Sequence, residues 1–279
     1  MDSLADMFER KVKRLAVHKH RRLKKEKRFK WFHAVLILLL IGILTSGILI
    51  IVWYHQGYNW NYLSDSNGRK SYTDAKGNTA LQGIDVSTFQ GDIDWQSVKN
   101  DGIDFVMIRA AFRGYETGKL MPDDNFEKNI SAANSVGLHT GVYVFSQALT
   151  SQEAEEEAEL TLGMIQNYQV DFPVALDVED ILGNEARTSS LSSQDRTEIV
   201  LAFLKTIRDA GYTPMIYSSK EFAEGSLILR ELRPYKFWLA MYEEQPDFQH
   251  SFQMWQYSKT GHVEGIEGNV DMDLSFLNF

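Results

Sequence analysis

Short apolar segments alternate with amphipathic ones from Gly83 to the C-terminus, and this alternation leaves few folds open to the chain. Apolar runs of strand length begin at residues 83, 105, 139, 173 and 213, and a segment with helical spacing follows each of them. Three more strand-like runs, 236–242, 251–258 and 269–277, have little helix between them. Strands separated by helices form parallel sheets, and eight such strands favour a closed barrel. We therefore predict an α/β fold, an irregular (β/α) barrel of about five βα units followed by three β-strands.

Cap signals support the expected helices. Ser151 opens the segment 151–168, with Ala154 and Glu155 close behind, in a pattern typical of a capped helix start. Gly137 and Gly211 lie where two of the helices are expected to end, and glycine is the residue that most often follows a helix C-terminus.

A long uncharged segment lies before the barrel. Ala34–Tyr54 contains no charged residue over 21 positions. A helix of this length spans about 30 Å, the thickness of a bilayer core. Trp31 and Phe32 precede it and Trp53 and Tyr54 end it, as expected of aromatic belts at two interfaces. A buried core helix would show a polar face, and a cleaved signal peptide would have a shorter apolar core. The sequence therefore predicts one transmembrane helix over residues 34–54.

Charge is distributed unevenly and predicts an orientation. Residues 1–30 hold twelve Lys/Arg and four Asp/Glu, a local charge of +8. Since the whole chain has a net charge of −9, the other 249 residues carry −17. Positive segments stay in the cytoplasm. We expect residues 1–33 to be a basic cytoplasmic segment and the polar residues 55–82 to be an extracellular stalk. The acidic domain, 83–279, is then extracellular, and its charge argues against nucleic acid as a partner.

Five carboxylates fall at or near the ends of predicted strands. Asp85 lies near the end of the first, Asp177 and Glu179 close the fourth, and Asp271 and Asp273 lie on the last. Residues two apart on a strand point to the same face, so each pair should project together. In a parallel barrel the active site forms at the C-terminal strand ends. These acids are therefore expected to meet in one pocket.

Each acid also has a structural interpretation. Asp85 alone resembles a turn or cap residue, and Asp180 resembles a solvated loop residue. The pair Asp177 and Glu179 is different, because two like charges at the end of an apolar strand cost free energy unless function requires them.

Other reaction classes have less support. The chain has no cysteine and no G-x-S-x-G motif, which disfavours the usual nucleophiles. Its acidic domain has three histidines, His139, His250 and His262, with no close pair, so we expect neither metal nor cofactor. Carboxylates alone are the groups of glycoside hydrolysis. Aromatic rings near strand ends favour a sugar substrate, and two or three of these candidates should face the cleft: Tyr143, Tyr217, Trp238, Tyr242, Trp255 and Tyr257.

Eight motifs in order carry a resemblance to a known family. They are GIDVSTFQGDIDW, FVMIRAAFRGY, GVYVFS, ALDVED, MIYSS, FWLAMY, MWQYS and GNVDMDLSF. Together they resemble the glycoside hydrolase family 25 lysozymes, the Chalaropsis-type muramidases, over Gly83–Phe279. The resemblance implies an irregular (β/α) barrel and cleavage of the β-1,4 bond from N-acetylmuramic acid to N-acetylglucosamine in peptidoglycan.

The resemblance also implies roles for the acids. Glu179 matches the general acid, with Asp177 beside it, Asp85 from the first strand and Asp271 from the last. We expect burial and the charge of Asp177 to raise the pKa of Glu179, while the three ionised aspartates stabilise positive charge on the sugar. A nucleophilic carboxylate, the acetamido group of the substrate and an activated water all remain open for the second step.

Two departures from the family affect substrate contacts rather than the acids. Val144 occupies a position where many members have His, and the second-strand motif continues as AAFRGYETGKLMPD. The sequence thus predicts a membrane-anchored muramidase on the outer face of the cytoplasmic membrane, with peptidoglycan strands as its partner. A non-catalytic glycan-binding or scaffold protein, and another wall hydrolase such as a glucosaminidase, amidase or deacetylase, are the alternatives.

Overall fold

The computed structural model describes residues 57–181 and 186–277, together with positions 31, 37, 39, 41 and 42. The chain divides into two units, Met1–Tyr58 and Asn59–Phe279, and the second contains every element discussed below. Apart from those five positions, the expected cytoplasmic segment 1–33 and transmembrane helix 34–54 lie outside the described residues. Within the described part, no helix has the length and apolar character needed to cross a membrane.

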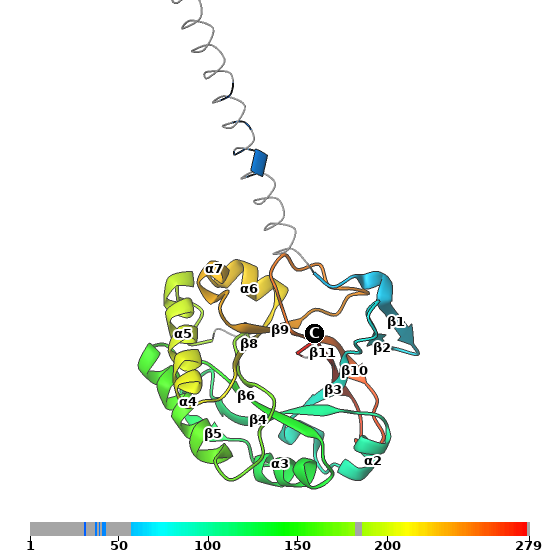
Figure 1. Cartoon of the computed structure of the whole chain (residues 1–279). Coiled ribbons are helices and arrows are strands. Elements are labelled where there is room, and N and C mark those ends of the chain that lie inside the picture. The colour runs from blue at the N-terminus through cyan, green and yellow to red at the C-terminus, as the bar shows by residue number, and fades with distance from the viewer. Residues whose placement is uncertain are drawn as a thin grey trace, which may run out of the picture. The chain divides into compact units, whose positions relative to one another are not determined.

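Eight strands close into a barrel (Figure 1). In chain order they are β3 (Leu81–Val86), β4 (Phe105–Arg113), β6 (His139–Phe145), β7 (Val174–Asp177), β8 (Pro214–Ser219), β9 (Lys236–Ala240), β10 (Met254–Gly261) and β11 (Val270–Ser275). The pairing of β3 with β4 completes the ring. All neighbours are parallel except β11, which runs antiparallel to both β10 and β3.

In the described part of the chain, helices follow the first five barrel strands and none follows the last three. They are α2 (Trp95–Asn100), α3 (Phe126–Ser135), α4 (Ser151–Ile165), α5 (Ser193–Asp209) and the pair α6 (Lys220–Ser226) and α7 (Leu229–Leu232). Figure 1 shows α3, α4, α5 and α6 outside the ring of strands. The predicted barrel of five βα units followed by three strands is confirmed.

The cap signals agree with the observed helix ends in all but one detail. Gly137 and Gly211 have φ of 74° and 90°, the left-handed conformation expected just past a helix C-terminus. Helix α4 does begin at Ser151, but its capping side chain is that of Thr150, which accepts a hydrogen bond from the Glu153 amide. The cap lies one residue earlier because the capping residue itself is not helical.

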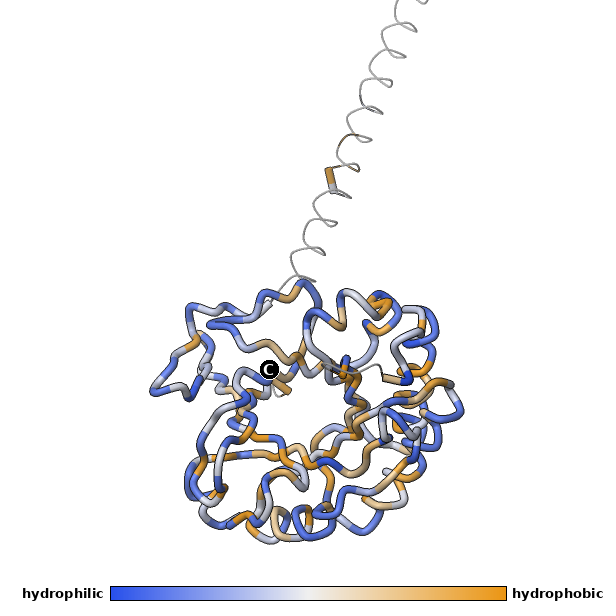
Figure 2. The backbone as a smooth tube through the Cα atoms, turned by 180° about the vertical axis from the view of Figure 1, so that it is seen from behind, coloured by the Kyte–Doolittle hydropathy of each residue, from blue (hydrophilic) through white to orange (hydrophobic). Residues whose placement is uncertain are grey.

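The barrel interior is filled by side chains below the strand ends. Phe105, Met107, Met215 and Trp238 belong to one buried cluster there. Gly83 allows this packing, because a Cβ at that position would lie 2.1 Å from the Phe105 ring. Figure 2 shows hydrophobic residues concentrated along the strands and hydrophilic residues along much of the outer chain.

Residues 59–82 correct the prediction of a stalk. They include η1 (Trp60–Tyr62) and the hairpin of β1 (Leu63–Ser66) and β2 (Arg69–Tyr72), and the last two of them begin β3. The Trp60 ring stacks on Phe252 at 6.2 Å and meets Trp255 edge-on at 5.6 Å. This segment packs against the last strands of the barrel, where no helix is present (Figure 1). The prediction failed because these contacts join residues far apart in the sequence, and short-range periodicity does not record them.

Candidate active site

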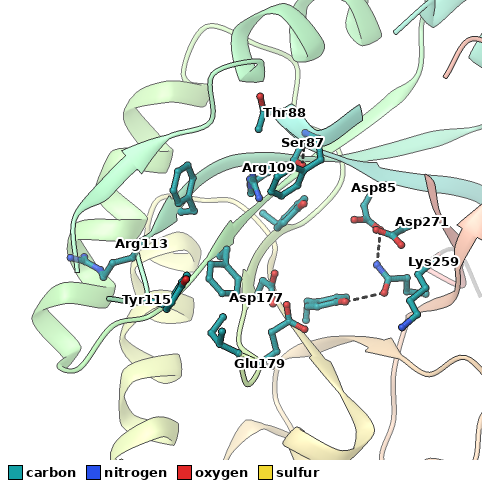
Figure 3. A pocket seen from close by; sticks show the side chains of 18 of the residues that line it. Asp85, Ser87, Thr88, Arg109, Arg113, Tyr115, Asp177, Glu179, Lys259 and Asp271 are labelled. Atoms are coloured by element: carbon teal, nitrogen blue, oxygen red, sulfur yellow. Dashed lines mark hydrogen bonds between the residues drawn. The ribbon is translucent and has the colours of Figure 1, made fainter. Parts of the chain in front are cut away.

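A cavity of about 780 Å³ opens at the end of the barrel where the seven parallel strands end and the antiparallel strand β11 begins (Figure 3). Each of the eight strands contributes a side chain to its lining: Asp85 (β3), Arg109 (β4), Tyr143 (β6), Asp177 (β7), Tyr217 (β8), Trp238 (β9), Gln256 (β10) and Asp271 (β11). Glu179 lies two residues beyond the end of β7 and also lines the cavity. The structure therefore brings the four predicted acids, Asp85, Asp177, Glu179 and Asp271, into one pocket.

The chain beyond β7 holds Glu179 in place. The Val178 amide donates to the Tyr217 carbonyl at 3.1 Å, and the Ser218 hydroxyl donates to the Val178 carbonyl at 2.8 Å. These bonds continue the β7–β8 pairing past Asp177, so Asp177 and Glu179 both face the cavity. Asp177 is only 6% exposed, whereas Glu179 is half-buried. Among the described residues, Oδ1 of Asp177 has no hydrogen-bond partner.

Gln256 connects Asp85 to two tyrosines. Its Nε2 donates to Oδ2 of Asp85 at 2.6 Å. Its Oε1 accepts from the hydroxyls of Tyr217 at 2.9 Å and Tyr242 at 2.7 Å. Gln256 is 2% exposed, and hydrogen bonds at both ends of its amide group fix its orientation.

Asp271 and Asp273 occupy different environments. Asp271 lies opposite Asp85 in the β11–β3 register and lines the cavity. Asp273 is fully buried, does not line the cavity, and accepts a 2.7 Å hydrogen bond from the indole of Trp238. The two share a strand face, but only Asp271 is near enough to the mouth to reach a ligand.

Burial makes these carboxyl groups hard to ionise. It raises the pKa of Asp85 and Asp177 well above the usual range, helped at Asp85 by the charges of Asp271 and Asp273 and at Asp177 by that of Glu179. Burial raises the pKa of Asp271 to about 6, against a lowering effect of Lys259. The cluster therefore retains protons at pH values where isolated carboxyls lose them.

Burial is also the main reason that the pKa of Glu179 is raised, followed by the charges of Asp271 and Asp180. The expected direction is confirmed, but Asp177 is not the source of the charge effect. The charge effect comes instead from Asp271, which lines the cavity, and from exposed Asp180, which lies outside the cavity lining.

Four of the aromatic residues predicted to contact sugar line the cavity: Tyr143, Tyr217, Trp238 and Tyr242. The Tyr217 and Trp238 rings meet edge-on at 4.6 Å, and Tyr242 is 46% exposed. Trp255 and Tyr257 do not line the cavity, so the assignment of Trp255 to substrate binding is wrong. On β10, Gln256 points into the barrel, and the alternation of side chains turns both of its aromatic neighbours outward.

Several lining residues were not predicted from the sequence, among them Phe89, Arg109, Gln256 and Lys259. Arg109 had a recognisable signal, because it is the one charge within the apolar run FVMIRAAF. Gln256, between two aromatic residues, had a weaker one. In the described part of the chain, no three His, Cys, Asp or Glu side chains are grouped so as to hold a metal ion.

Comparison with known proteins agrees with this geometry. The family described as glycosyl hydrolases family 25 matches residues 84–266. The chain is similar to the Escherichia coli K12 protein YegX, with 32% identity over 197 residues, 70% of this chain and 69% of YegX. It is also similar to lysozyme M1 of Streptomyces globisporus, with 30% identity over 207 residues, 69% of this chain and 67% of that protein.

Solved structures share the fold. The lysozyme of Streptomyces coelicolor superposes with a TM-score of 0.59 at 26% identity, over 69% of this chain and 90% of that one. The autolysin LytC of Streptococcus pneumoniae has a TM-score of 0.62 at 23% identity, over 76% of this chain. The matched region spans about half of LytC, 51% of its length.

Proposed function

The chain belongs to family 25 of the glycosyl hydrolases and is a glycoside hydrolase, and from this premise we propose that it is an N-acetylmuramidase. It would cleave the β-1,4 linkage from N-acetylmuramic acid to N-acetylglucosamine in peptidoglycan. One observation supports the proposal most strongly: half-buried Glu179, with its raised pKa, faces the same cavity as Asp85, Asp177 and Asp271.

Glu179 is the proton donor in this proposal. A raised pKa keeps its carboxyl protonated until the glycosidic oxygen needs the proton. Its position at the mouth, beyond the end of β7, suits contact with a bond between two sugars, one inside the cavity and one outside. The proton passes from the Glu179 carboxyl to the leaving oxygen as the C–O bond breaks.

The aspartates stabilise the charge that develops on the sugar. Burial opposes the ionisation of Asp85, Asp177 and Asp271, and repulsion from neighbouring carboxylates adds to it at Asp85 and Asp177. A positive, oxocarbenium-like sugar would relieve that repulsion, so the attraction is strongest in the transition state. Interactions that strengthen in the transition state are the ones that accelerate a reaction.

Product analysis tests the bond specificity. Purified peptidoglycan is digested, the new reducing ends are reduced with borohydride, and the sugar alcohols are identified. Muramitol is the expected product. Glucosaminitol would indicate a glucosaminidase, new amino termini without reducing ends an amidase or peptidase, and no product at all a glycan-binding protein.

A matched pair of variants tests the acid. Glu179→Gln removes the proton but keeps the shape, and it should fold normally while losing activity by orders of magnitude. Glu155→Gln changes an exposed glutamate on α4 that does not line the cavity, and it serves as the control. Normal lysis by a folded Glu179→Gln variant would remove Glu179 from the mechanism.

We also propose that residues 34–54 anchor the enzyme in the cytoplasmic membrane, with the barrel outside. The uncharged length of 34–54 and the basic residues before it support this proposal. Since the chain has no cysteine, single cysteines at Ser3 and Lys76 can report orientation in intact cells. An impermeant maleimide should label Lys76→Cys and not Ser3→Cys, and recovery of the chain in the soluble fraction would contradict the anchor.

A further inference from the structure

A cation beside two phenyl rings forms the wall of the cavity next to β3 and β4. The guanidinium of Arg109 lies 4.9 Å from the ring centre of Phe89 and 5.1 Å from that of Phe112. All three residues line the cavity, and we call them the Arg109 cluster. Phe89 is 82% exposed, whereas the Arg109 side chain is 12% exposed. The cluster thus combines a largely shielded cation with an exposed apolar ring.

Asp123 holds this cluster rigid from behind. Its side chain is fully buried, and its Oδ2 accepts from Nε of Arg109 at 2.9 Å and lies 2.7 Å from Nη2. The same oxygen accepts from the Thr88 amide at 3.0 Å, in the short turn η2 (Thr88–Gln90) that carries Phe89. One carboxylate therefore fixes both the cation and the turn, and the wall is preorganised.

The guanidinium keeps an unused edge. Arginine has five N–H donors in a planar fork, and here Nε and Nη2 are directed to Asp123. Among the described residues, none accepts a hydrogen bond from Nη1 of Arg109. A charged donor left open in a cavity wall is a recognition group for an acceptor atom of the ligand.

The surroundings restrict what that acceptor can be. Asp85 and Asp177 line the same cavity, so a neutral carbonyl is a better ligand than a carboxylate. The exposed ring of Phe89 calls for apolar atoms next to the carbonyl, on a group long enough to leave the cavity. An acetamido group is too short, since it ends at one methyl, and it occurs on both sugars of the glycan.

We propose that the Arg109 cluster is the subsite for the lactyl-L-alanyl junction of the muramoyl unit, where the stem peptide leaves the sugar. Arg109 donates to the lactyl carbonyl, and the rings contact the lactyl and alanyl methyl groups. This inference rests on the proposed muramidase function, because only the muramoyl sugar carries that junction. The subsite would then place muramic acid, and not glucosamine, in the acid-lined cavity.

Binding tests the subsite without hydrolysis. The full chain carrying Glu179→Gln is titrated in detergent with N-acetylmuramoyl-L-alanyl-D-isoglutamine and, separately, with N-acetylglucosamine. Adding Arg109→Lys should weaken binding of the muramoyl dipeptide about tenfold, the loss expected for one charged hydrogen bond. Adding Phe89→Ala should weaken it about threefold to fivefold through lost apolar contact, and this exposed position carries little risk to folding. Both should change N-acetylglucosamine binding much less.

Tyr62→Ala is the matched control, since Tyr62 is a 40% exposed aromatic residue outside the cavity lining. Equal losses for both ligands would assign the cluster to the acetamido group and overturn the proposal, as would unchanged binding of the dipeptide. If the dipeptide preference depends on Phe89 and Arg109 but the unsubstituted enzyme releases no reducing ends, the subsite holds and the proposed hydrolysis fails. If the unsubstituted enzyme releases muramitol normally but Phe89→Ala leaves dipeptide binding unchanged, the proposed hydrolysis holds and the subsite fails.

Discussion

Asp271 lies directly opposite Asp85 in the antiparallel pairing of β11 with β3. Side chains in such a pair are about 5 Å apart at Cβ, so two carboxyls are held together in a buried cavity. The charge of Asp271 raises the pKa of both Asp85 and Glu179. Asp271 therefore influences Glu179, beyond the end of β7, as well as its own neighbour Asp85.

The pH profile of the enzyme should respond to Asp271. In the proposed mechanism Glu179 acts in its protonated form, so activity should be lost as pH rises through its pKa. Asp271→Asn removes a charge that raises this pKa, and the alkaline limb of kcat/KM should move to lower pH. The maximal rate should fall about a hundredfold, the usual loss for one electrostatic group at a transition state.

Asp180→Asn is the control for this shift, because the charge of exposed Asp180 raises the same pKa. Its shift should have the same direction but be smaller, since solvent screens an exposed charge. An alkaline limb that is unchanged in Asp271→Asn would show that Glu179 is not the group titrating there.

Replacing Asp271 should make the folded chain more stable at neutral pH. The pKa of Asp271 is about 6 in the folded chain and near the ordinary 3.8 when unfolded, so the folded state binds the extra proton between these values. The stability that this proton on Asp271 gives to the folded state is fully present below pH 4 and is lost as pH rises through 6. Asp271→Asn should raise the free energy of unfolding at pH 7 by about 1 to 3 kcal/mol. Urea titrations at pH 4 and pH 7 measure this, and an equal effect at both pH values would contradict it.

Gln256 should matter for rate more than for binding. Gln256→Leu keeps the size but leaves the Asp85 carboxyl and the hydroxyls of Tyr217 and Tyr242 without their partner. A misplaced Asp85 should lower kcat about tenfold to a hundredfold, with a smaller change in KM. Tyr242→Phe removes one of the three hydrogen bonds and should have an intermediate effect. Steady-state kinetics on soluble glycan strands give both constants, and an unchanged kcat would exclude this role for Gln256.

The segment 59–82, which precedes most of the barrel, should be necessary for the stability of the barrel. Trp60→Ala removes the ring that packs on Phe252 and Trp255, and it should lower the free energy of unfolding by about 2 to 4 kcal/mol. Tyr62→Ala, at a more exposed neighbour, should cost less than about 1 kcal/mol. Urea unfolding of the two variants decides this, and similar small losses would mean that the segment is only loosely attached.

The spacing of the sequence was sufficient for the barrel and for its acids. Apolar runs ending in Asp177 and Glu179, or containing Asp85, have the period of a strand, and the parallel direction of these strands places their ends at one mouth. Asp271 reaches the same mouth because β11 runs antiparallel and begins there, and spacing alone does not show that direction. The period and the ends of a strand depend on residues within a few positions along the chain, so they can be predicted from the sequence.

The sequence left other features undetermined. Trp255 and Tyr217 are both aromatic residues of barrel strands, yet only Tyr217 reaches the cavity, because the face of each strand depends on its register with its neighbours. Asp271 and Asp273 share a face but differ in depth. Residues 59–82 lack periodicity, and their packing becomes visible only beside the helix-free strands.

The sequence by itself therefore determined the family, the succession of strands and helices along the chain, and the identity of the four acids. The tertiary structure alone decided that Gln256 orients Asp85, that Asp271 and Asp180 act on Glu179, and that Arg109 presents an open edge to the cavity. The physical reason is the range of the interactions involved. Periodicity and strand ends are local, whereas pKa shifts, buried hydrogen bonds and cavity walls arise between residues that only the closed barrel brings together.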